Sequence, residues 1–347
     1  MVAEATARNA ELAKVHDEID SILSATLELD DYVDLNTLRT VAEHPPFPRE
    51  DLEVPISPPA PTVARPEPIY VEPEAPKGLG AVFGGKKKHT ELVAQRRRDY
   101  EADHRAWQAE VAALPSVQLR ETQEHEKQEQ QRLAALSEAR RQYEADCEQR
   151  EAAAAETNHR LDELIAGIEY NVEDAIQQYV SIVLGNSVYP ESFPVDHDFE
   201  FDPTLKELAL TVLVPTPADL PPEKEFKYVK AKDQISATML PKKDQKERYS
   251  NAVFQVALRS LHEIFEADRA GRIQTVALKL CAVGTDPATG VKKHSVLVAA
   301  AADRETFMTF ELANVVPRAT LEHLGASVST NPFELIEVDS SQGVRGG

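Results

Sequence analysis

Apolar side chains recur every three or four residues at the start of the chain, which is the spacing of one helix face. This pattern predicts a helix from residue 3 to about residue 29, and a shorter helix is expected at residues 35–44, before Pro45. We therefore expect amphipathic helices at residues 1–44, with a face that must be buried against another part of the protein. The first helix carries on that face Leu12, Val15, Ile19 and Ile22.

Prolines dominate the next segment, residues 45–76, and glycines follow at residues 78–85. A proline-rich run cannot hold a helix and favours an extended polyproline conformation. Residues 45–85 are therefore interpreted as a Pro/Gly-rich linker. Two alternatives stay open for the prolines: a ligand for a proline-recognising groove, or an extended segment that lies along a neighbouring helix.

Residues 86–184 combine seam-like apolar positions with charged stretches, which is typical of a long or coiled-coil helix. Pro115 interrupts this region and either kinks one helix or marks the turn of a helical hairpin. Residues 120–132 have almost no apolar side chains and predict either a solvated single helix or a frayed elbow. Because so long a helix is seldom stable alone, we expect a partner, from another copy or from the N-terminal helix. The predicted assembly seam consists of Val93, Tyr100, Trp107, Leu133, Leu136, Leu161, Leu164 and Ile168.

Apolar and polar residues alternate in short runs from residue 196 onward, which predicts strands joined by turns. A strong amphipathic helix is expected at residues 241–270, with a stop at Gly271. Asp303 is expected to cap a short helix, and the bridge at residues 230–240 is expected to be helical or irregular. The predicted strands are 196–201, 207–214, 225–229, 273–284 and 294–302.

Residues 185–338 should form one globular domain, followed by a flexible tail at residues 339–347. The order of its elements is typical of an α+β domain with an antiparallel sheet. The predicted fold class is therefore α+β, in which a long helical, coiled-coil-like region is followed by a compact domain with an antiparallel sheet and packed helices.

The formal net charge of −21 favours solubility and disfavours nucleic-acid binding by the chain as a whole. Two cysteines, Cys147 and Cys281, indicate neither a disulfide framework nor a zinc site. The first residues lack the pattern of a signal peptide, and the longest apolar run, 296–302, is too short to cross a membrane. We therefore expect a cytoplasmic protein that has no cofactor.

The densest basic stretch of the globular part lies between Lys224 and Arg248, with Tyr228 among its lysines and Tyr249 next to its end. Lysines neutralise phosphates and tyrosines stack on bases, so this stretch is a candidate nucleic-acid contact. Neighbouring acidic residues offset much of its charge, and a solvated protein surface is the alternative. The candidate contact residues are Lys224, Lys227, Lys230, Lys232, Lys242, Lys243, Lys246 and Arg248.

Asp219, Glu225 and Lys227 imitate a short nuclease pattern, in which two carboxylates and a lysine hold magnesium and polarise a phosphate. So short a match arises readily by chance, and a charged strand edge is the simpler interpretation. His262 and Glu266 are four residues apart on the predicted helix, but a metal site needs more ligands. Because no complete catalytic motif is found, we assign no catalytic, cofactor-binding or metal-binding residue.

Several separated blocks between residues 162 and 329 carry a resemblance to a known family. They include FKYVKAKDQISATMLP with the helix that follows it, the turn DPATG, and the run FELANVVPRATLEHLGASVS. This part of the chain resembles the region that precedes the nuclease domain in bacterial Mrr-like restriction system proteins. The resemblance implies a defence-related or DNA-related context. The family's endonuclease domain would lie beyond Val338, so we carry over no catalytic residue.

We therefore expect a non-catalytic assembly or sensor module related to restriction systems, which forms oligomers through its helices and recognises a partner by its α+β domain. A DNA-binding accessory protein that uses Lys224–Arg248 is the first alternative. A cytoplasmic coiled-coil scaffold without a role in defence is the second. The expected partner is another copy or a different protein, with nucleic acid as the alternative partner and no membrane.

Overall fold

The computed structural model describes residues 1–75, 85–286 and 288–338. Most of the glycine-rich end of the predicted linker and the predicted C-terminal tail lie outside these residues. The contacts within the chain divide it into two units. We call them the sheet unit, Met1–Thr40 with Glu156–Gly347, and the helix–strap unit, Val41–Ala155.

Five strands form the main sheet: β1 (Asp196–Asp202), β2 (Glu207–Val214), β5 (Thr275–Thr285), β6 (Lys292–Asp303) and β7 (Ser327–Val328). Their order is β1-β2-β5-β6-β7, and neighbours are antiparallel except for β2 and β5, which are parallel. The predicted α+β class is confirmed, with a mixed sheet where an antiparallel one was expected. The parallel pair arises because a long crossover, which contains helix α4 (Lys242–Ala267), joins β2 to β5.

A second sheet consists of two antiparallel strands, β3 (Glu223–Val229) and β4 (Gln234–Met239). The helical or irregular bridge predicted at residues 230–240 is therefore wrong. Ile235 is the one residue of β4 that is partly buried. A strand with so little burial has no alternation of apolar and polar residues that would reveal it in the sequence.

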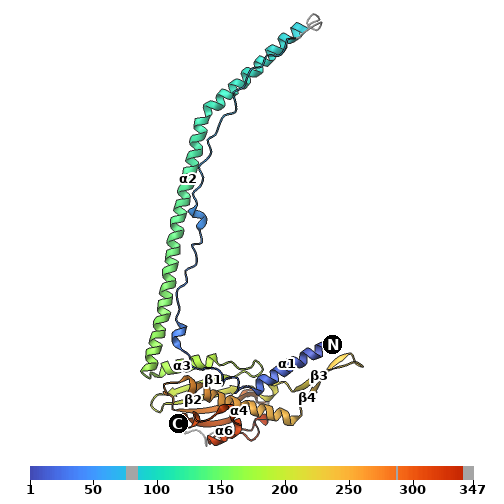
Figure 1. Ribbon diagram of the computed structural model, residues 1–347, viewed down its shortest axis with the longest axis vertical. Helices are drawn as coiled ribbons and strands as arrows, with labels where there is room; N and C mark the ends of the chain where they lie inside the picture. Colours follow the sequence, from blue (N-terminus) through green and yellow to red (C-terminus); the bar gives the residue numbers. More distant parts are fainter. Residues whose placement is uncertain (76–84, 287, 339–347) are drawn as a thin grey trace. The chain divides into compact units, whose positions relative to one another are not determined.

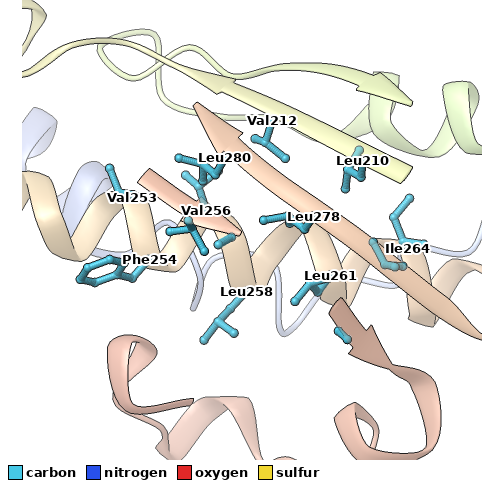
Figure 2. Close-up of a cluster of buried hydrophobic side chains, with 14 of the residues drawn as sticks. Leu210, Val212, Val253, Phe254, Val256, Leu258, Leu261, Ile264, Leu278 and Leu280 are labelled. Carbon is cyan, nitrogen blue, oxygen red and sulfur yellow. The ribbon is translucent and has the colours of Figure 1, made fainter. Parts of the chain in front are cut away.

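Helix α4 lies at the centre of the hydrophobic core of the sheet unit (Figure 2). Its apolar residues recur at helical spacing, and Leu261 is fully buried in this core, as are Leu210 of β2 and Leu278 of β5. Leu258 points away from these strands and is nevertheless fully buried. The helix predicted at residues 241–270 is thus covered on more than one side.

The N-terminal helix α1 (Val2–Asp20) packs within the sheet unit against β3 and α4. Its buried stripe is the predicted one, and Ile19 is fully buried. The helix ends before the predicted residue 29, and turns follow it. The second helix predicted at residues 35–44 is limited to the single 3-10 turn Leu35–Leu38.

The predicted long helical region consists of two helices, α2 (Gly85–Glu169) and α3 (Glu173–Asn186). Asn171 separates them with a positive φ of 56°, a left-handed conformation that often ends a helix. Helix α2 continues through Pro115, so the kinked helix is observed and the hairpin is not. Proline in a helix interior removes a backbone hydrogen bond and bends the helix, and Figure 1 shows a bend in the teal part of α2.

Two short helices follow the main sheet strands, α5 (Arg304–Phe307) and α6 (Pro317–His323). The Asp303 carboxylate caps α5, as expected, by accepting a hydrogen bond from the Thr306 N–H at 3.0 Å. Gly271 has a φ of 65°, the left-handed conformation expected after α4. Among the described helices, none combines the length and the apolar character that a membrane-spanning helix requires.

Candidate functional site

Residues 45–75 of the proline-rich segment, which we call the strap, lie along α2 within the helix–strap unit (Figure 1). The backbone oxygen of Pro45 accepts a hydrogen bond from the Tyr143 hydroxyl at 2.7 Å. Further along the strap, Arg65 O accepts one from Trp107 Nε1 at 3.0 Å, so the strap is antiparallel to the helix. Of the interpretations that the sequence left open, the segment laid along a helix is the one observed.

Polar side chains of α2 bind the strap backbone in the region where the helix lacks apolar residues. The Glu129 carboxylate accepts a hydrogen bond from the Ile56 N–H at 3.1 Å, and His125 Nε2 lies 2.9 Å from Ile56 O. An extended segment without a neighbouring strand has free backbone groups, and these side chains satisfy them. Residues 120–132 belong to the continuous helix α2, so the predicted single helix is observed and the frayed elbow is not, while the strap lies along this part of the helix.

Five of the predicted seam residues lie in the helix–strap unit. The Tyr100 ring is edge-on to the Tyr70 ring of the strap, with centroids 5.5 Å apart. Leu133, in contrast, is 50% exposed. This part of the seam therefore contributes to two surfaces, one facing the strap and one facing solvent. Its partly buried members are Val93, Tyr100, Trp107 and Leu136.

The other three seam residues, Leu161, Leu164 and Ile168, belong to the sheet unit. Leu161 and Leu164 are buried with Leu35 and Ala175 in a small cluster, and Ile168 packs against it. Side chains within a unit's own core are not available to a second copy. The structure therefore does not bring the eight seam residues together on one surface.

Large apolar side chains remain exposed along the helix–strap unit. On α2, Leu119 is 59% exposed in addition to Leu133, and on the strap Ile69 is 85% and Val71 75% exposed. A unit built from one helix and one extended segment has a single layer and no interior in which to bury them. These four residues form the group that we call the exposed apolar residues.

The predicted basic stretch is partly neutralised by acidic partners. Four of its members are in ion pairs: Lys227, Lys243, Lys246 and Arg248. The other four make no ion pair within the part of the chain that the structure describes: Lys224, Lys230, Lys232 and Lys242. Tyr249, a candidate for stacking on bases, is fully buried and therefore unavailable.

The short nuclease-like pattern does not assemble a site. Asp219 accepts hydrogen bonds from the N–H and the hydroxyl of Thr216, at 2.8 and 2.7 Å, and so caps a 3-10 turn. Glu225 and Lys227 form a local ion pair with each other. Within the described ranges, no group of metal-ligand side chains includes Asp219 or Glu225.

A buried ion pair lies on α4. Arg259 is 3% and Glu263 1% exposed, and Arg259 Nε donates to Glu263 Oε1 at 2.6 Å. The guanidinium also donates to Ile22 O at 3.1 Å and to Val188 O at 3.0 Å. Charges removed from water are tolerated when they are paired and hydrogen-bonded in this way, so the pair connects α4 to the segments after α1 and α3.

Asp31, His262 and Glu266 lie next to this pair. One ligand-type atom of each residue lies within 4.8 Å of the other two. Burial raises the pKa of Asp31 to about 7, with smaller contributions from the nearby carboxylates of Glu263 and Glu266. Burial also lowers the pKa of His262, which favours a neutral imidazole. The helical pair seen in the sequence is therefore completed by a third side chain from a distant segment.

A cavity of about 370 Å³ lies in the sheet unit, between the end of α2, α3 and the end of α4. Its wall is largely apolar and includes Ile168, Ile176 and Val183. Tyr179 and Arg269 bring polar groups to it. The volume falls in the range of small-molecule sites, about 300–1,000 Å³, so this cavity is a second candidate site.

Comparison of the chain with protein-family models, with curated proteins and with solved structures finds no match. The resemblance to Mrr-like restriction system proteins therefore stays a prediction. The sequence did indicate His262 and Glu266, but not Asp31 or the buried pair. The spacing of Arg259 and Glu263, four residues apart on an amphipathic helix, is the signal that could have indicated that pair.

Proposed function

We propose that this protein is an assembly module related to restriction-type defence systems, in which the helix–strap unit joins copies of the chain and the sheet unit recognises a partner. The observation that carries the proposal is the set of exposed apolar residues on the helix–strap unit. Large apolar side chains that remain exposed are found where proteins associate.

The occupant that best fits these residues is a second copy of the same unit. Tyr100 and Trp107 already bind the strap, so the face left for association is the one that carries Leu119 and Leu133. Pairing two such units would supply a second layer, which the single helix with its strap lacks. The resemblance of residues 162–329 supports the defence-related part of the role.

Light scattering on the full chain over a range of concentrations tests this proposal. The expected result is a mass above the 38.4 kDa of one chain. A variant with Leu119→Lys and Leu133→Lys should shift toward one chain, because two desolvated charges oppose association. The matched control is Gln123→Lys, at an exposed polar position of the same helix. A mass of one chain at every concentration would remove the assembly role.

A DNA-binding accessory role is the second candidate, favoured by the four lysines of the basic stretch that lack ion pairs. Binding of a labelled DNA duplex should be followed by fluorescence anisotropy at low and high salt, because phosphate contacts weaken steeply with salt. The variant is Lys224→Glu with Lys230→Glu and Lys232→Glu, and Lys14→Glu is the control. No binding at low salt rules out this role and leaves the assembly role untouched.

A further inference from the structure

Three side chains of metal-ligand type meet in the sheet unit, away from the surfaces that carry the proposed function. Asp31 comes from the irregular segment that follows α1 and its turns, and His262 and Glu266 come from successive turns of α4. Each places one ligand atom within 4.8 Å of the other two. The residues are distant in the sequence, so folding brings them together.

The segment that carries Asp31 is held on both sides. Arg269 donates a hydrogen bond to the Asp30 carboxylate at 2.5 Å, and its guanidinium lies 4.1 Å from the centre of the Tyr32 ring. The Val33 N–H donates to the hydroxyl of Tyr179 at 3.3 Å. These contacts fix the backbone around Asp31, and preorganised ligands of this kind are what a metal site requires.

Several polar atoms around this point lack a hydrogen-bond partner among the described residues. They include Asp31 Oδ2, together with His262 Nε2 and Glu266 Oε2, which lie 3.2 Å from each other as an ion pair. Glu263 Oε2 is also unpartnered, although its side chain is 1% exposed and acts electrostatically on both Asp31 and His262. Buried polar atoms almost always have a partner, so the unpartnered Asp31 Oδ2 beside the His262–Glu266 pair leaves room for a bound species.

The charges at this point are also unbalanced. Asp31, Glu263 and Glu266 supply three carboxylates, and the guanidinium of Arg259 is paired with one of them, Glu263. Arg269, the next cation, is engaged by Asp30. A divalent cation would balance the excess negative charge and would give the ligand atoms of Asp31, His262 and Glu266 a common partner.

We propose that Asp31, His262 and Glu266 bind a divalent transition-metal ion, which ties the irregular segment after α1 to α4. One imidazole nitrogen with two carboxylate oxygens suits Zn²⁺ or Mn²⁺ better than Mg²⁺ or Ca²⁺, which prefer oxygen ligands alone. Atoms that are each about 2 Å from one ion lie within about 4 Å of one another. Small rotations of these partly exposed side chains therefore suffice to place all three ligands on the ion.

Isothermal titration calorimetry on the full chain, stripped of metal with a chelator, tests the site with Zn²⁺ as the probe. One ion per chain should bind, and Asp31→Asn and Glu266→Gln should each weaken binding at least about tenfold, since even outer-shell changes weaken metal sites by that much. Glu247→Gln, at an exposed position of the same helix, is the matched control and should bind like the parent chain. Circular dichroism checks that each variant is folded.

A second measurement distinguishes a metal site from a cluster of carboxyl groups that only share protons. Zn²⁺ should raise the melting temperature of the parent chain and of Glu247→Gln, but not that of Asp31→Asn, because a ligand stabilises the state that binds it. Absence of binding heat would overturn the proposal and leave a proton-sharing cluster. Equal Zn²⁺ affinity in all variants, or Mg²⁺ binding as tight as Zn²⁺ binding, would overturn it as well.

Discussion

In the sheet unit, Leu258 and Leu261 of α4 are fully buried, whereas in the helix–strap unit Leu119 and Leu133 of α2 are at least half exposed. The first unit has a core between α4 and the sheet, and the ion pair Arg259–Glu263 is buried in that unit. The second has no core, and much of its internal bonding joins side chains of the helix to the backbone of the strap. The comparison shows that apolar burial holds one unit of this chain together, whereas hydrogen bonds between side chains and backbone hold the other.

This difference should appear in how each unit unfolds. Apolar burial supplies most of the driving force of folding, so the sheet unit should hold most of the stability. A helix that is held by side-chain hydrogen bonds opens locally at a lower free energy, because each such bond contributes only about 0.5–1.5 kcal/mol. The predictions that follow compare the two units, from the largest expected effect to the smallest.

Breaking the buried ion pair should have the largest effect. Arg259→Met leaves Glu263 charged and unpaired in the core, and we expect a loss of about 3–5 kcal/mol in the free energy of unfolding. The comparison in the helix–strap unit is Arg141→Met, whose partner Glu138 is 63% exposed, and here we expect a much smaller change because solvent screens the pair. Urea unfolding measures both. Equal losses would show that burial does not distinguish the units.

Removing one apolar side chain from each unit comes next. Leu258→Ala should lower the free energy of unfolding by about 2–5 kcal/mol, because it leaves a cavity in a packed core. Leu133→Ala removes the same atoms from a half-exposed position and should change it by about 0.5 kcal/mol or less. Thermal or urea unfolding followed by circular dichroism provides the values. A large loss from Leu133→Ala would indicate that a second copy buries this side chain.

Weakening the strap should have a smaller and local effect. Trp107→Phe removes the indole N–H that binds Arg65 O, and we expect a loss of about 1 kcal/mol that is confined to the helix–strap unit. Hydrogen exchange along the strap and α2 should increase, while exchange in β5 and α4 should not change. Faster exchange in α4 would contradict the separation of the two units.

The pH dependence should have opposite signs in the two units. In the metal-free protein, the folded-state pKa of Asp31, about 7, exceeds its ordinary value of 3.8, so between these pH values the folded protein binds more protons and loses stability as pH rises. Asp31→Asn should therefore flatten the fall in stability between roughly pH 4 and pH 7. In the helix–strap unit, a hydrogen bond from Arg132 lowers the pKa of Glu129 to about 2, so its contribution is present above pH 4.5 and lost as pH falls toward 2.

The single tryptophan makes this contrast measurable, because Trp107 lies in the helix–strap unit and its fluorescence reports that unit alone. Fluorescence of the parent chain should change as pH falls below 4.5, and Glu129→Gln should remove part of that change. Circular dichroism unfolding curves of Asp31→Asn and the parent chain serve for the sheet unit. A rise in parent stability between pH 4 and pH 7 that Asp31→Asn leaves unaltered would contradict the assignment.

Local patterns were enough to predict much of the sheet unit. Helix α4 and strand β2 follow from apolar spacing, because each buries a face whose period is that of the element. Strand β4 was missed since its residues are mostly exposed, and the parallel direction of β2 and β5 depends on the crossover through α4, which no local pattern encodes. The long helix was predicted, and the strap along it was one of the alternatives that the sequence left open. The sequence could not decide between them, because the strap is bound largely through backbone groups, which carry no sequence signal.

The candidate metal site was predictable only in part. His262 and Glu266 are four residues apart on a helix, which the sequence shows directly. Asp31 lies in an irregular segment without periodicity, and it reaches α4 because Arg269 holds its neighbours Asp30 and Tyr32. Three-dimensional contacts of this kind join distant segments, so a single sequence cannot reveal them.

The antiparallel path of the strap ties the lengths of two distant stretches of the chain to each other. Pro45 lies at Tyr143 and Pro73 at His89, so 28 residues of the strap accompany 54 residues of the helix. A polyproline segment rises about 3.1 Å per residue and an α-helix about 1.5 Å, which accounts for this two-to-one ratio. Homologues with α2 longer by about seven residues should therefore carry straps longer by about three or four, a paired insertion that can be sought in sequences alone.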